Sequence, residues 1–135
     1  GTLSGNPISM SAGRAAVAEI FRRGPDLFQG LETLGAKLQE GLLRALNESG
    51  VNGCVQRVGS MLTLFFHPGP VTNMRVAGTV DTRKFARFFH AMLHQGVYLP
   101  PSQFECWFIS TAHTEIEIQR TVDAARMALQ AVASN

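Results

Sequence analysis

The chain has 135 residues, of which 45% are hydrophobic and 16% charged, and its formal net charge is +2. A length of about 100 to 200 residues is typical of one domain with its own core, and this composition excludes intrinsic disorder. The basic residues are scattered along the sequence, so they indicate neither a nucleic-acid-binding surface nor a polybasic membrane patch.

The cysteine pattern and the hydropathy narrow the cellular setting. Cys54 and Cys106 lie far apart in no C-x-x-C motif, which favours a reducing compartment over a disulfide framework or a zinc site. No apolar run reaches the roughly 18 residues that span a bilayer, and no signal-peptide pattern is present. We therefore expect a cytoplasmic protein with no membrane or nucleic-acid partner. Because the sequence starts at Gly1 without methionine and enters a helical pattern almost at once, we expect it to be a piece of a longer protein.

The first predicted helix runs from Pro7 to about Arg23. Asn6 is a suitable N-cap, and proline suits the first helical position because its missing N–H would be unpaired there in any case. The segment is rich in alanine and apolar nearly all round, which predicts burial on more than one side. Since so short a chain can hardly cover such a helix, we expect part of its partner surface to lie outside the chain.

A second helix is predicted after the break at Gly24–Asp26 and ends at Gly50, a residue that tolerates positive φ. Its leucines recur at spacings of three and four, which is typical of one buried face. These residues are Leu27, Leu31, Leu34, Leu38, Leu42 and Leu46.

Two strands are predicted next, Cys54–Val58 and Ser60–Phe66, with Gly59 between them. The following stretch, His67–Thr79, contains prolines and glycines and is predicted to be a long loop. Loops of this length are often functional or lie at an interface.

The last part of the chain alternates helices with short apolar runs. Asp81 is predicted to cap a third helix that ends near Gln95. Short strands are predicted at Val97–Leu99 and Cys106–Ile109. Thr114 opens the last helix with a capping box.

This element order predicts an α+β fold, a small and mostly antiparallel sheet covered by helices and preceded by the buried, Ala/Gly-rich helix.

Most motifs that carry chemistry are absent from the sequence. His90 and His94 have the i, i+4 spacing of zinc ligands, but Ala91 stands where the metalloprotease motif needs glutamate, so we expect no metal site. Neither a Gly-rich phosphate-binding loop nor a G-x-S-x-G nucleophile motif occurs.

Two features remain open on the residues alone. The stretch Gly1–Pro7 places glycines and hydroxyls before a helix N-terminus, where an anion such as phosphate is favoured, although an ordinary capped turn explains it as well. Glu105 lies between Phe104 and an apolar run, where an acid either has a functional role or points outward from an edge strand.

Five stretches, in this order along the chain, resemble the glutamate-1-semialdehyde 2,1-aminomutase family within the subgroup-III pyridoxal-phosphate aminotransferases. They are Gly1–Pro7, Arg57–Phe66, Phe85–Leu93, Gly96–Glu105 and Ala112–Thr114. The resemblance extends over essentially the whole chain and corresponds to the C-terminal part of those enzymes. Arg14 and Cys106 depart from the usual pattern, which puts only local packing in doubt.

The resemblance implies a homodimeric, fold-type I pyridoxal 5'-phosphate enzyme. Its reaction converts glutamate-1-semialdehyde to 5-aminolevulinate for porphyrin synthesis and is an isomerisation. The chain would then divide into residues 1–50, a phosphate-proximal loop with two linking helices, and residues 51–135, the small C-terminal α+β domain.

The resemblance also assigns roles to individual residues. The threonine that matches Thr2 contacts the cofactor phosphate of the neighbouring subunit, and the glutamate that matches Glu105 lies in the substrate pocket. Three further positions in the matching blocks, Ser102, Gln103 and His113, are interpreted as supporting.

The lysine that holds the cofactor as a Schiff base is not expected in this chain. Its two lysines, Lys37 and Lys84, stand in contexts unlike the family's cofactor lysine, which precedes this region. We therefore expect the chain alone to be inactive. Two alternatives stay open: part of another subgroup-III aminotransferase that acts on an ω-amino substrate, and a self-standing, non-catalytic α+β binding module.

Overall fold

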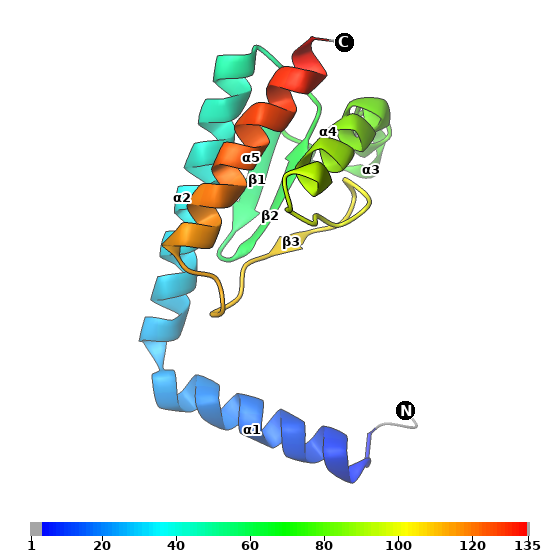
Figure 1. The fold of residues 1–135 in the computed structure, drawn as a ribbon. Helices are drawn as coiled ribbons and strands as arrows, with labels where there is room; N and C mark the ends of the chain where they lie inside the picture. Colours follow the sequence, from blue (N-terminus) through cyan, green and yellow to red (C-terminus); the bar gives the residue numbers. More distant parts are fainter. Residues whose placement is uncertain (1–3, 135) are drawn as a thin grey trace.

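The computed structural model describes residues 4–134, which form helices at both ends and a small sheet in the middle of the chain (Figure 1). The elements in order are α1 (Pro7–Arg23), α2 (Pro25–Ser49), β1 (Cys54–Val58), β2 (Met61–Phe65), α3 (Met74–Ala77), α4 (Thr82–His94), β3 (Trp107–Phe108) and α5 (Glu115–Ala133). The predicted α+β class is confirmed.

The predicted helix caps are confirmed. The Asn6 side chain accepts hydrogen bonds from the amides of Ile8 at 3.0 Å and Ser9 at 3.2 Å. Asp81 accepts from the amide of Lys84 at 2.9 Å, and Thr114 opens α5 with a capping box. Each cap satisfies amide groups that have no partner inside the helix, so these short polar side chains set where the helices begin.

The sheet is antiparallel with the strand order β1-β2-β3. β1 and β2 form a hairpin in which Val58 pairs with Met61, and β3 adds two residues by pairing Phe108 with Met61. α2, α4 and α5 lie over one face of this sheet (Figure 1). The buried strand residues point to that face, together with the half-buried Arg57, and they are Val55, Leu62, Leu64 and Trp107.

α2 packs closely on both the hairpin and α5. A Cβ atom at Gly41 would lie 2.8 Å from Cγ1 of Val122, so only glycine permits this approach of α5. Arg57 on β1 donates to Gln39 at 2.9 Å and to Glu32 at 2.7 Å, both on α2. The ion pair with Arg57 lowers the pKa of Glu32. These contacts fix the sheet against α2.

Two of the predicted elements differ from the structure. Val97–Leu99 is not a strand, because the amide of Val97 donates to the carbonyl of Met92 at 3.0 Å and is therefore not available to a sheet. The predicted loop His67–Thr79 contains the short helix α3, which Asn73 caps. The strand predicted at Cys106–Ile109 is present but shorter, as β3.

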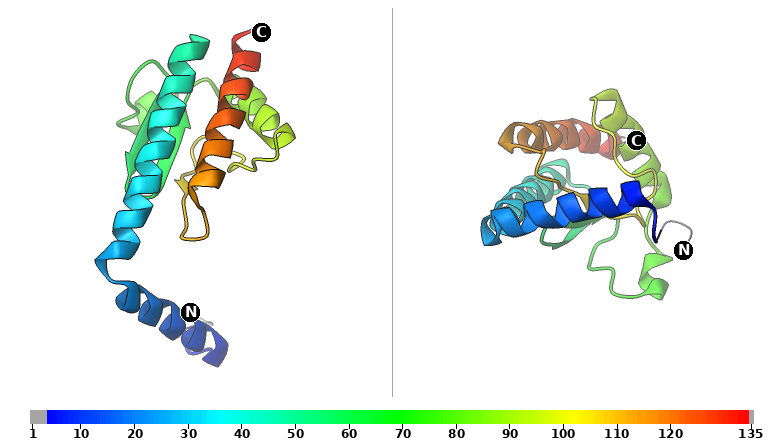
Figure 2. Two further views of the ribbon diagram at one scale, coloured as in Figure 1. Left: turned by 60° about the vertical axis from the view of Figure 1, so that its left-hand side comes forward. Right: turned by 90° about the horizontal axis from the view of Figure 1, so that it is seen from below.

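α1 is not buried within this chain, contrary to the prediction from its composition. None of its residues is buried, and the helix extends away from the end of α2 in all three views (Figures 1 and 2). Ile8 is 80% exposed and Phe21 is 81% exposed. No described element packs along α1, so its apolar side chains are exposed, although the composition of the helix predicts that they are buried.

The division at residue 50 stays a prediction. The second half of α2 contributes Leu42 and Leu46 to the same core as the sheet and α5.

Among residues 4–134, none of the helices combines the length and the hydropathy that a membrane-spanning helix requires.

The exposed apolar side chains of α1 predict self-association of the isolated chain. We expect the 135-residue chain to bind a hydrophobic dye strongly and to elute as an oligomer or aggregate in size-exclusion chromatography. A chain that starts at Pro25 serves as the control and should bind less dye. A dye-silent, monodisperse monomer of the complete chain would contradict this reading.

Candidate functional site

Glu105 lines a hollow of about 470 Å³ between the segment 97–101, β3 and the start of α5. Leu99 and Ile118 contribute apolar walls, while Tyr98 and His113 contribute polar groups. A mostly apolar hollow with a few polar side chains is typical of a small-molecule site. The predicted position Glu105 therefore lies where a ligand can be held, and its carboxyl group is exposed rather than taken up by the fold.

The backbone of Glu105 is held in a turn beside β2. Its amide donates to the carbonyl of Ser102 at 3.1 Å, and its own carbonyl accepts from the hydroxyl of Thr63 at 3.3 Å. The hydroxyl of Ser102 accepts from the amide of Phe104 at 3.2 Å. Ser102 and Thr63 thus fix the place at which the Glu105 side chain leaves the chain.

Trp107 also lines this hollow, and the sequence reasoning missed it. Its side chain is buried, and its indole N–H has no hydrogen-bond partner among residues 4–134. The signal was present in the strand pattern, because Trp107 pairs with the inward-facing Leu62 and so points to the same face. The Trp107 side chain therefore contributes to the inner wall of the hollow.

His113 lies in the turn that precedes α5. Its Nδ1 accepts from the amide of Ser110 at 3.0 Å. In the next turn of chain, the hydroxyl and the amide of Thr114 both donate to Glu117, at 2.6 Å and 2.7 Å. These hydrogen bonds lower the pKa of Glu117. The capping box therefore holds the turn that carries His113 against the hollow.

The other two supporting positions lie apart from this hollow. Ser102 and Gln103 line a smaller hollow of about 280 Å³ together with residues of α4, among them Phe89 and His90. The structure thus brings Glu105 and His113 to one hollow, while Ser102 and Gln103, in the same segment as Glu105, line the other.

Thr2 lies outside the described residues, so its role stays a prediction. The start of α1 is less open to an anion than its sequence suggested. The amides of Ile8 and Ser9 are bonded to the Asn6 side chain, and the amide of Met10 donates to the Asn6 carbonyl at 2.9 Å. The first amides of α1 are therefore not free to bind a phosphate.

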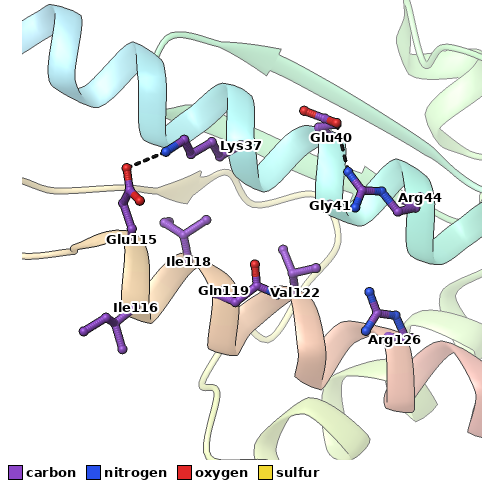
Figure 3. A pocket seen from close by; sticks show the side chains of 10 residues that line it. All are labelled: Lys37, Glu40, Gly41, Arg44, Glu115, Ile116, Ile118, Gln119, Val122 and Arg126. Carbon is purple, nitrogen blue, oxygen red and sulfur yellow. Dashed lines mark hydrogen bonds and ion pairs between the residues drawn. The ribbon is translucent and has the colours of Figure 1, made fainter.

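The larger hollow, of about 500 Å³, lies between α2 and α5 (Figure 3). Its cationic side chains are already paired: Lys37 with Glu115, Arg44 with Glu40 at 2.9 Å, and Arg126 with Glu48 at 3.0 Å. Because these carboxylates already offset the cations, the hollow offers little net charge to a ligand, and we do not assign it a role.

Neither lysine lies at the Glu105 hollow. Lys37 is paired with Glu115 across the larger hollow, and Lys84 lies 3.9 Å from Asp81 in the first turn of α4. In the part of the chain that the structure describes, no three His, Cys, Asp or Glu side chains are grouped closely enough to bind a metal ion.

No protein-family model matches the chain. It is 55% identical over 133 residues to a glutamate-1-semialdehyde 2,1-aminomutase from Thermomicrobium roseum, covering 98% of this chain and 30% of that enzyme. An omega-transaminase structure from Sphaerobacter thermophilus matches with a TM-score of 0.79 and 30% identity, covering 100% of this chain and 30% of that one.

A glutamate-1-semialdehyde-aminomutase structure from Pseudomonas aeruginosa PAO1, in complex with PMP, matches with a TM-score of 0.82 over 96% of this chain and 28% of that one. At 23% identity, this likeness shows the fold alone. The chain spans about 30% of the length of the curated relatives that it matches. The resemblance inferred from the five sequence stretches is confirmed.

Proposed function

We propose that this chain is the C-terminal segment of a glutamate-1-semialdehyde 2,1-aminomutase, a pyridoxal-phosphate enzyme that forms 5-aminolevulinate for porphyrin synthesis. The observation that carries the proposal is 55% identity, over nearly the whole chain, to a relative of that name. The whole protein is then an isomerase, because it moves an amino group within one substrate. We further propose that it is a cytoplasmic homodimer, as the family resemblance implies.

The family resemblance assigns Thr2 to the phosphate end of the cofactor. The first amides of α1 are bonded to Asn6, so in this proposal the contact comes from the Thr2 side chain and not from those amides. In this proposal the Thr2 hydroxyl donates to the cofactor phosphate across the subunit boundary. When bound, pyridoxal phosphate supplies the electron-accepting ring that the amino-group transfer needs. In this proposal the cofactor lysine comes from outside this chain, because neither Lys37 nor Lys84 lines the Glu105 hollow.

Glu105 is the residue of this chain that we propose to face the substrate. Its carboxyl group is exposed at an apolar hollow, while its backbone is fixed by Ser102 and Thr63. An ionised carboxylate only accepts hydrogen bonds, which suits the amino group of an amino-aldehyde substrate. The hydrogen-bonded backbone and the exposed side chain together let Glu105 orient that group.

The proposal predicts a specific activity for the full-length protein that contains this segment. With pyridoxal phosphate or pyridoxamine phosphate bound, it should convert glutamate-1-semialdehyde to 5-aminolevulinate with no added amino acceptor. Activity that depends on an added 2-oxo acid would instead support an aminotransferase, which the match to an omega-transaminase at 30% identity makes the second candidate. A protein that is inactive in both assays would favour the non-catalytic module.

The phosphate role of Thr2 predicts weaker cofactor retention in the Thr2→Ala variant of the full-length dimer. Removing one hydrogen bond to a charged phosphate should weaken cofactor binding by about 1.5 to 3 kcal/mol, measured by titrating the apoenzyme. Thr33→Ala is the matched control, because the Thr33 hydroxyl donates to Gln29 within α2, at 2.9 Å. Equal cofactor affinity in the two variants would overturn the role of Thr2.

A further inference from the structure

Gln103 is the polar residue that the fold buries most completely in the described part of the chain, at 1% exposure. Its side-chain oxygen accepts a hydrogen bond from the amide of Phe66 at 3.3 Å. Phe66 directly follows the last residue of β2, so this contact ties the segment 100–105 to the end of the central strand.

Phe66 also anchors α4. The carbonyl of Phe66 accepts from the amide of Asp81, the N-cap of α4, at 3.1 Å. Gln103 therefore uses the one backbone donor that Phe66 offers, at a point where strand, helix and segment meet. A contact at such a junction sets the position of the segment relative to the sheet.

Glu105 lies only two residues beyond Gln103 in a segment that belongs to no helix or strand. The hydroxyl of Thr63, also on β2, donates to the Glu105 carbonyl at 3.3 Å. β2 and the residue that follows it thus contact this segment on both sides of Phe104. Phe66 bonds to Gln103 before it, and Thr63 bonds to Glu105 after it. Gln103 and Glu105 lie in no strand themselves, so these two side-chain contacts act together with the turn between Ser102 and Glu105, and with the pairing of Trp107 to Leu62, in placing Glu105.

The burial of Gln103 has a cost that packing alone does not explain. Its side-chain nitrogen finds no acceptor among residues 4–134. A buried amide with an unmet donor is unfavourable, and an apolar side chain of the same length would fill this place without that penalty. What glutamine adds over such a side chain is the hydrogen bond to Phe66.

We propose that Gln103 is a positioning residue for Glu105, and this inference rests on the proposed function of Glu105. By bonding to Phe66, Gln103 keeps the segment 100–105 against β2 and so holds the Glu105 carboxylate at the edge of its hollow. A misplacement of about 1 Å in a substrate-orienting group is enough to change a rate on the order of a hundredfold.

The test uses the full-length enzyme with Gln103→Met, which keeps the length of the side chain and removes its hydrogen bond. Gln56→Met is the matched control, because Gln56 accepts from the amide of Val71 at 2.7 Å and holds a different loop to β1. We expect Gln103→Met to lower kcat/KM by about tenfold to a hundredfold, with a raised KM for glutamate-1-semialdehyde. Gln56→Met should leave both constants within about twofold of the unchanged enzyme, since it touches nothing near Glu105.

The double variant Gln103→Met/Glu105→Gln separates positioning from a merely structural role. If Gln103 acts through Glu105, its replacement causes no further loss once Glu105→Gln is present. An equal loss in both backgrounds, or a Gln103→Met enzyme that behaves like Gln56→Met, would overturn the proposal. If the protein without substitutions is active and Glu105→Gln does not change its kinetic constants, the role of Glu105 and the positioning role of Gln103 are both overturned. If the protein without substitutions has no mutase activity, the proposed function itself is refuted.

Discussion

Helices α2 and α5 approach each other so closely at Gly41 that one additional carbon atom would overlap Val122. This approach sets the distance of α5 from the sheet, because α2 is itself fixed to the hairpin by the Arg57 contacts. The turn before α5 carries His113, so the same contact decides where that side of the Glu105 hollow lies. The lack of a side chain at Gly41 on α2 is therefore a condition for the shape of the site at the start of α5.

The opposite side of the hollow depends on the end of β2. Both backbone groups of Phe66 are used there, one by Gln103 and one by Asp81. The segment 97–106 has no ladder of its own, yet it is placed by side-chain hydrogen bonds to a strand that lies in the middle of the sheet. Glu105 thus stands on a segment that is irregular in form and fixed in position, an arrangement typical of functional loops on rigid scaffolds.

The helices and their starts could be predicted because their causes are local. Asn6, Asp81 and Thr114 each satisfy amides within three residues, and leucine spacing marks the buried face of α2 without knowledge of the partner. The sequence wrongly predicts a strand at Val97–Leu99. No strand forms there because the amide of Val97 donates to Met92 and because no strand of the described residues lies beside this segment.

The candidate site was only partly within reach of the sequence. Glu105 could be singled out as an acid in apolar surroundings, and the family resemblance supplied its role and that of Thr2. Trp107 and the junction at Phe66 depend on contacts between residues distant in sequence, which a pattern along one segment does not contain. The exposure of α1 has a similar origin, since its composition predicts burial but cannot say which molecule provides the covering surface.

The claim that the α2–α5 contact organises the domain is tested most directly by the free energy of unfolding of residues 25–135 in denaturant. Gly41→Ala should destabilise this segment by about 1 to 3 kcal/mol, because the added carbon forces α5 away. Gly30→Ala, in the same helix at a place with no neighbouring atom within 4 Å, should stabilise it by about 0.5 to 1 kcal/mol through helix propensity. If Gly41→Ala were as stable as Gly30→Ala, the close contact would not be the constraint on which the site depends.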